Sequence, residues 1–160
     1  MVIRNIEKED LEEIIELESR AFSFDIAANA DVFLYRLRAF PESFFVAEAD
    51  HRIIGFINGG ASSQKLITDE LFQLGHHCPI GEHQMIFGLV VHPVYRNHGV
   101  ASALIERMIQ YARETNKKSV VLTCEERLVP YYERFGFENL GISQSKVGGV
   151  EWLDMVMTIK

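Results

Sequence analysis

The stretch from Ile86 to Ala112 constrains the fold more than any other part of this sequence. Ile86–Val91 is a short run of β-forming apolar residues that ends at His92-Pro93. After Gly99, apolar residues return with the period of an amphipathic helix, at Ala101, Leu104, Ile105, Met108, Ile109 and Ala112. The pattern therefore predicts a strand, a tight turn and a helix, in that order.

The turn between strand and helix has the composition of an anion-binding site. It reads Arg96-Asn97-His98-Gly99-Val100-Ala101. The first N–H groups of a helix have no partner within the helix, and the helix dipole adds positive potential there, so such a turn binds phosphate oxygens. Gly99 and Ala101 keep bulky side chains away from that backbone. The sequence contains neither a P-loop pattern nor the Gly-x-Gly-x-x-Gly pattern of dinucleotide sites.

A second segment of interest follows the helix. Ser119–Thr123 reads as a buried strand, and Leu128–Phe137 reads as a short helix with Pro130 in its first turn and Gly136 at its end. Two adjacent tyrosines lie in this short helix.

Both segments resemble the GNAT acetyltransferase superfamily. The turn fits the family's pyrophosphate loop, Arg/Gln-x-x-Gly-x-Gly/Ala, which binds acetyl-coenzyme A, and the tyrosine helix fits its aromatic-Tyr-Glu-Lys/Arg-x-Gly-Phe segment. The resemblance implies that Tyr132 lies beside the coenzyme thiol as a general acid. The alternative is that Tyr131 and Tyr132 are packing aromatics. The coenzyme site that the resemblance implies consists of Leu89, Val90, Val91, Arg96, Asn97, His98, Gly99, Val100, Ala101 and Ser102.

The chain further resembles the arylalkylamine N-acetyltransferase branch of this superfamily. The segments that carry the likeness are Leu17–Phe22, Leu89–His92, Cys124–Phe137 and Val147–Trp152. That branch uses a histidine pair to remove the proton from the amine. The aligned residues here are Met85 and Phe87, which cannot accept a proton. We therefore expect His83, at the start of the same strand, to be the base, with Glu82 as the alternative.

His76, His77 and Cys124 are expected to have no chemical role. His76-His77-Cys78 followed by His83 lacks the pair spacing of structural zinc sites, so we expect a solvated loop and no metal. Cys124 shows no histidine partner and is interpreted as a small buried hydrophobe.

Length and charge limit the partners that are expected. A chain of 160 residues predicts a single domain, residues 1–160. The net charge of −7 argues against nucleic acid or an acidic membrane as a partner. No apolar stretch has membrane-spanning length and no leader opens the chain, so a cytoplasmic protein is expected. The expected partner is a small-molecule amine. The sequence is compatible with a monomer and with a homodimer.

The expected fold is the GNAT fold of the α/β (α+β) class, a mixed, mostly antiparallel twisted sheet flanked by helices. A V-shaped split between its fourth and fifth strands forms the coenzyme slot. Predicted strands are Val2–Asn5, Ser43–Glu48, Arg52–Ser62, a strand ending at Val91, Ser119–Thr123, Glu138–Gln144 and Glu151–Ile159. Predicted helices are Glu7–Phe22, Asp31–Phe40, Gly99 to about Thr115 and the tyrosine helix.

The resemblance implies an acetyl-CoA-dependent N-acetyltransferase that acts on a primary amine, with an arylalkylamine as the favoured acceptor. The acceptor cleft is expected between Phe22–Phe40 and Leu71–His83. Its aromatic residues would stack on an aryl ring or hold an ammonium, and they are Phe22, Phe24, Phe33 and Tyr35. The alternatives are a protein or peptide amine acetyltransferase and a non-catalytic domain that binds acyl-CoA.

Overall fold

Nine strands form two sheets, which the chain joins through residues 83–91. The computed structural model describes all 160 residues. The first sheet has the antiparallel order β1-β2-β3-β6, with β1 Val2–Asn5, β2 Phe44–Ala49, β3 Arg52–Asn58 and β6 Gly88–Val91. The second has the order β4-β5-β7-β9-β8, with β4 Ala61–Ser62, β5 His83–Met85, β7 Ser119–Cys124, β9 Leu153–Thr158 and β8 Glu138–Ile142. Only β5 and β7 pair in parallel, so the expectation of a mostly antiparallel sheet is confirmed.

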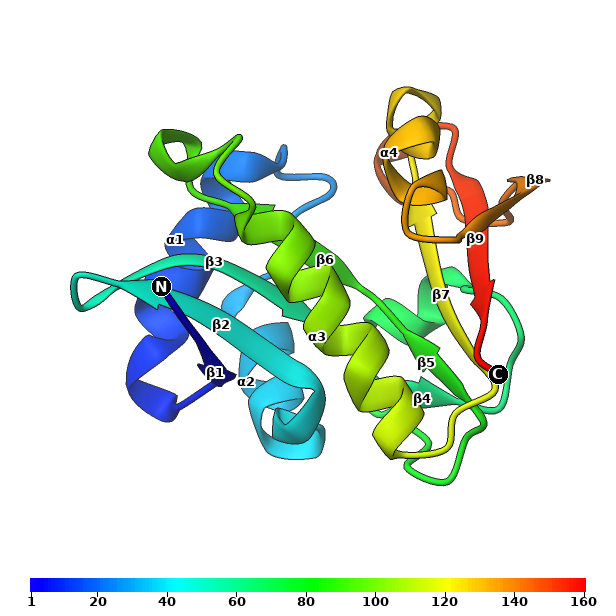
Figure 1. Cartoon of the computed structure of the whole chain (residues 1–160), viewed down its shortest axis with the longest axis horizontal. Coiled ribbons are helices and arrows are strands. Elements are labelled where there is room, and N and C mark those ends of the chain that lie inside the picture. The colour runs from blue at the N-terminus through cyan, green and yellow to red at the C-terminus, as the bar shows by residue number, and fades with distance from the viewer.

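Four α-helices flank these sheets, at α1 Leu11–Ala21, α2 Ala30–Ala39, α3 Val100–Glu114 and α4 Val129–Glu133. Short 3-10 turns occur at η1 Lys8–Asp10, η2 Pro41–Ser43, η3 Asp69–Phe72, η4 Pro93–Tyr95, η5 Glu126–Leu128 and η6 Val147–Gly149. Helix α3 crosses one face of the first sheet, and α1 and α2 lie on the other (Figure 1). None of the helices combines the length and the apolar character needed to cross a bilayer.

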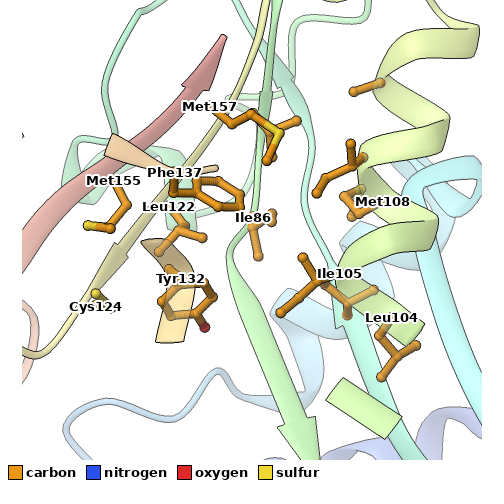
Figure 2. Close-up of a cluster of buried hydrophobic side chains, with 14 of the residues drawn as sticks. Ile86, Leu104, Ile105, Met108, Leu122, Cys124, Tyr132, Phe137, Met155 and Met157 are labelled. Atoms are coloured by element: carbon orange, nitrogen blue, oxygen red, sulfur yellow. The ribbon is translucent and has the colours of Figure 1, made fainter. Parts of the chain in front are cut away.

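The alternation of side chains along β2 explains this sandwich. Phe45 and Ala47 point into a cluster of 20 buried residues that α3 covers, whereas Phe44 and Val46 point into a cluster of 9 buried residues with α1 and α2. The larger cluster also includes side chains from β7, β9 and α4 (Figure 2). It therefore packs both sheets and α3 into one body.

The two sheets diverge where the chain passes from β5 to β6 (Figure 1). The Ile86 N–H donates to Val121 O of the second sheet (2.8 Å), and the Phe87 N–H donates to Asn58 O of the first (2.7 Å). The prediction of one strand over Ile86–Val91 is therefore corrected, because the chain changes sheets at this dipeptide. The result is a split between β6 and β7 at the predicted place.

The predicted strand Arg52–Ser62 is also interrupted, at Gly59-Gly60. A Cβ on Gly59 would overlap the carbonyl of Met85, so only glycine allows this approach of the two segments. The predicted strands Ser43–Glu48 and Arg52–Ser62 form a hairpin in the structure: Asp50 and His51, with φ of 51° and 61°, connect β2 to β3.

Candidate active site

One edge of β6 has no neighbouring strand beside the split. The His92 N–H donates to Ile54 O of the adjacent β3. Because backbone groups alternate between the two edges of a strand, the N–H groups of Leu89 and Val91 face the split. The Val91 carbonyl, which accepts from Nε of Arg96 (3.3 Å), faces the same side. This edge can add an extended, amide-bearing ligand as a further strand.

The turn after β6 bends sharply into α3. Asn97 and Gly99 both have left-handed backbone conformations, with φ of 64° and 80°. Gly99 is the N-cap of α3, and a Cβ placed on it would meet no protein atom within 4 Å. That Cβ would instead project into open space beside the helix N-terminus, where an anionic ligand is favoured.

A cavity of about 830 Å³ lies beside β6 and this turn. It is lined by nine of the ten residues predicted to bind the coenzyme, namely Leu89, Val90, Val91, Arg96, Asn97, Gly99, Val100, Ala101 and Ser102. His98, the tenth, is exposed and is not part of the lining. Arg127, Tyr131 and Arg134 line the opposite wall. We refer to this space as the coenzyme cavity.

A second cavity of about 430 Å³ is lined by residues of α1, α2 and the loop between them, and by residues of β6 and β7. Its lining includes Phe72, Phe87, Cys124 and Trp152. The two cavities share four lining residues, which are Phe22, Leu89, Leu128 and Tyr132. A group in one cavity can therefore meet a group in the other beside Tyr132. We refer to the second space as the acceptor cavity.

Tyr132 belongs both to the core and to this junction. Its ring packs edge-on against Tyr131 and Phe137, with ring centroids 5.4 and 5.9 Å apart, and the residue is 9% exposed. Its hydroxyl lies at the end of the ring that points away from Phe137 (Figure 2). Burial, reinforced by Cys124 and Tyr131, raises the pKa of Tyr132 well above its ordinary value. The hydroxyl therefore holds its proton at neutral pH and can donate it.

Cys124 also lines the acceptor cavity, but its thiol is not activated. The residue is 3% exposed and packs in the large core cluster. Burial, with a contribution from Glu125, raises the pKa of Cys124 to about 11. A thiol that stays protonated at neutral pH is a poor nucleophile.

His83 is not brought to either cavity. It begins β5, is buried, and its Nδ1 lies 2.7 Å from Oγ of Ser119 on the parallel strand β7. Glu82 is exposed and pairs with Lys118 at 3.0 Å. His76 is exposed, and nowhere do three or more His, Cys, Asp or Glu side chains gather in a group that could hold a metal.

Of the four aromatics expected around the acceptor, only Phe22 lines the acceptor cavity. Phe24 is 98% exposed, and Phe33 is fully buried between α2 and the sheet. The Tyr35 hydroxyl accepts a hydrogen bond from the His77 N–H (3.2 Å), away from this space. The predicted acceptor segments contribute Phe22, Asp25–Asn29, Val32, Arg36, Phe72 and Gln73 but nothing from residues 74–83.

Two buried charged residues of the acceptor cavity are missing from the sequence-based prediction. Glu18 of α1 and Arg36 of α2 both line it, at 6% and 3% exposure. A charged residue on the inward face of an amphipathic helix was the available signal, since such residues are rarely fully buried without a role or a partner.

The far side of the acceptor cavity is held by hydrogen bonds between distant segments. Oδ1 of Asp69 in η3 accepts from the Ser145 hydroxyl (2.6 Å), and Oδ2 accepts from the Lys146 N–H (2.9 Å). Trp152 donates from Nε1 to Val147 O (2.9 Å). Ser145, Val147 and Trp152 all line the cavity, so these bonds fix part of its wall.

Comparisons with known proteins agree with this geometry. The family model described as Acetyltransferase (GNAT) family matches residues 8–137. The serotonin N-acetyltransferase of Mesocricetus auratus is 27% identical over 162 residues, covering 98% of this chain and 77% of that protein. Among solved structures, the GphF GNAT-like decarboxylase in complex with isobutyryl-CoA has a TM-score of 0.82 at 19% identity, with 100% of both chains covered.

The structure of yncA, a putative acetyltransferase from Salmonella typhimurium with its cofactor acetyl-CoA, has a TM-score of 0.73 at 18% identity. It covers 99% of this chain and 94% of the yncA chain. These two structural likenesses show the fold, and the family-model match over residues 8–137 shows the family. The chain is therefore an N-acetyltransferase of the acetyltransferase (GNAT) family.

Proposed function

We propose that this protein transfers the acetyl group of acetyl-CoA to the primary amine of a small molecule, with arylalkylamines as the first acceptor class. The observation that carries the proposal is the meeting of two cavities at Phe22, Leu89, Leu128 and Tyr132. One cavity has the residues for a pyrophosphate and an extended amide chain. The other is lined by Phe22, Phe72, Phe87 and Trp152, which suit an apolar or aromatic body.

In the proposed reaction the amine attacks the thioester directly. A primary amine has a pKa near 10, so it must first lose a proton from its ammonium form. The nitrogen lone pair then forms a bond to the thioester carbon, the carbon–sulfur bond breaks, and sulfur leaves with the electron pair. Tyr132 gives its hydroxyl proton to that sulfur and regains one from the new amide nitrogen through solvent. The free N–H groups along β6 would polarise the thioester carbonyl.

The volume of the acceptor cavity and the protonated Tyr132 bear on the two alternative functions, a peptide acetyltransferase and a non-catalytic domain that binds acyl-CoA. The volume of about 430 Å³ lies within the range typical of small-molecule sites. A non-catalytic domain that only binds acyl-CoA would need no protonated Tyr132 at the junction. An enzyme that acetylates peptides would use the same coenzyme residues. Short peptides are therefore among the acceptors that the experiment tests.

The experiment is an acceptor screen that measures thiol release from acetyl-CoA with arylalkylamines, polyamines, aminoglycosides and short peptides. Turnover is expected with phenethylamine-like amines and not with peptides. The Gly99→Val variant is the blank, because its side chain would occupy the space at the helix N-terminus. Turnover with peptides alone would favour the protein-acetylating alternative, and binding of acetyl-CoA without turnover would favour the non-catalytic one.

A further inference from the structure

The acceptor cavity contains two buried, oppositely charged side chains that form no ion pair. Its charged lining residues are Glu18, Asp25 and Arg36, of which Asp25 is exposed. Glu18 and Arg36 are 6% and 3% exposed, and neither takes part in a salt bridge. Buried charges without a close partner are costly, so their place beside a cavity calls for an explanation.

Arg36 is oriented by neutral acceptors, and the charge of Glu18 acts on it without a salt bridge between the two side chains. Its Nη1 donates to Oδ1 of Asn58 (2.9 Å) and its Nη2 to Phe72 O (3.3 Å), both neutral acceptors. The guanidinium lies over the rings of Phe33 and Phe87, 5.6 and 5.1 Å from their centroids. Burial lowers the pKa of Arg36 to about 10, so the group stays positive at neutral pH. Its flat fork, fixed in place, is suited to a carboxylate.

Glu18 and Asn58 each leave one polar atom without a partner next to Gly88. Oε2 of Glu18 accepts from the Ala28 N–H (2.9 Å), whereas its buried Oε1 has no hydrogen-bond partner. The buried Nδ2 of Asn58 also has none. A Cβ on Gly88 would lie 3.2 Å from this Nδ2 and 3.9 Å from that Oε1. Gly88 directly precedes Leu89, one of the residues that both cavities share.

We infer that the acceptor is an amino carboxylate, whose ammonium binds Glu18 and whose carboxylate binds Arg36 and Asn58. Burial raises the pKa of Glu18, the Ala28 N–H and the charge of Arg36 oppose that shift, and an ammonium beside the free Oε1 would favour the ionised form further. That oxygen then accepts an N–H of the ammonium, and the guanidinium and the amide Nδ2 are donors for a carboxylate. The apolar walls, including Phe22 and Trp152, take the side chain of the acceptor. The inference rests on the proposed acetyl transfer to a small-molecule primary amine and adds a carboxylate to the acceptor.

The experiment compares amines that differ only in a carboxylate. Phenylalanine is paired with phenethylamine, and leucine with isoamylamine, with thiol release measured at saturating acetyl-CoA. We expect the wild-type kcat/KM to be about 10- to 100-fold higher for the amino acid in each pair, the effect of charge-assisted hydrogen bonding to its carboxylate. In Arg36→Met that preference should vanish, because the amino acid loses turnover through KM while its decarboxylated partner does not. Arg38→Met, an exposed change on the same helix, is the matched control.

Several outcomes would overturn the inference. A wild-type enzyme that acetylates phenethylamine as well as phenylalanine contradicts it while leaving the proposed function intact. Equal losses for both members of a pair in Arg36→Met also contradict it, because they indicate a purely structural role. Turnover with none of the four amines overturns it together with the aryl acceptor class. The ratio of kcat/KM between an amino acid and its decarboxylated partner is measured on the wild-type enzyme. The test therefore stands even where Arg36→Met does not fold.

Discussion

At the scale of single residues, the environment of a side chain indicates whether it suits the proposed acetyl transfer or has a structural role. Tyr132 and Cys124 line the same cavity, and burial raises the pKa of both. A raised pKa suits the proton donation that we propose for Tyr132 and disables a cysteine that would have to attack as a thiolate. His83 lies outside both cavities and is held by Ser119.

For Tyr132→Phe we expect kcat to fall by roughly 10²–10⁴, the usual contribution of a general acid. The ring stays in place, so the KM for acetyl-CoA should change little. Steady-state thiol release measures both quantities. Tyr131→Phe is the control and should keep the wild-type kcat. A wild-type rate in Tyr132→Phe would assign Tyr132 to packing alone.

For His83→Ala we expect a loss of stability that depends on pH. Burial lowers the pKa of His83 in the folded protein, so the unfolded chain binds the proton more readily. Wild-type stability therefore falls as the pH drops below about 6.5, the ordinary histidine pKa, and this loss is absent above it.

The variant should be less stable at pH 8, by about 1–3 kcal/mol for a lost buried hydrogen bond, and the gap should narrow toward pH 5. Urea unfolding at several pH values measures this, with the exposed His76→Ala as control. A kcat lowered most at acid pH would instead restore His83 as the base.

At the scale of elements, the walls of the acceptor cavity depend on contacts between segments far apart in the chain. Asp69 in η3 contacts Ser145 and Lys146, 76 and 77 residues away. These bonds hold the segment before η6 against the cavity, while the coenzyme cavity is formed by β6, α3 and α4 and does not include them. A change at Asp69 should therefore act on one cavity only.

For Asp69→Ala we expect the acceptor KM to rise about tenfold or more, since the variant loses two hydrogen bonds to a charged group, each worth about 1.5 kcal/mol. The Kd for acetyl-CoA, measured by calorimetry, should stay unchanged. Glu70→Ala removes a neighbouring exposed carboxylate and should leave both values unchanged. An equal weakening of coenzyme binding would show that the change disturbs the fold as a whole.

At the scale of the whole molecule, sequence patterns predict helices and turns that depend on neighbouring residues. They miss contacts between residues that are far apart in the chain. The apolar periods at α1 and α3 and the turn at Gly99 depend on neighbouring residues, and the structure confirms these elements. Glu18 and Arg36 fall on the inward faces of their helices, but the helical period does not say what they contact. Their burial depends on the loop to Ala28 and on Asn58, a residue 22 positions from Arg36, and no local pattern records such contacts.

The break at Ile86-Phe87 was missed for the same reason, because each residue pairs with a different sheet. Phe24 shows the opposite error: it reads as part of an aromatic site, yet its side chain is 98% exposed.

A coenzyme that binds between β6 and α4 should stabilise the whole protein. At 100 times its Kd, acetyl-CoA should add about 2.7 kcal/mol to the free energy of unfolding, if it binds only the folded state. For a domain of this size that raises Tm by about 5–10 °C. Differential scanning fluorimetry measures the shift, and Gly99→Val should show none. A similar shift in the variant would contradict the assignment of the turn after β6.

The change of sheet at Ile86-Phe87 also allows hydrogen exchange to monitor the opening of each sheet separately. The Ile86 amide is protected by Val121 of the second sheet, and its immediate neighbour, the Phe87 amide, by Asn58 of the first. Each amide exchanges only when its own bond opens. Two consecutive positions in the chain therefore record the openings of two different sheets, and the ratio of their exchange rates tells whether the sheets open together or one at a time.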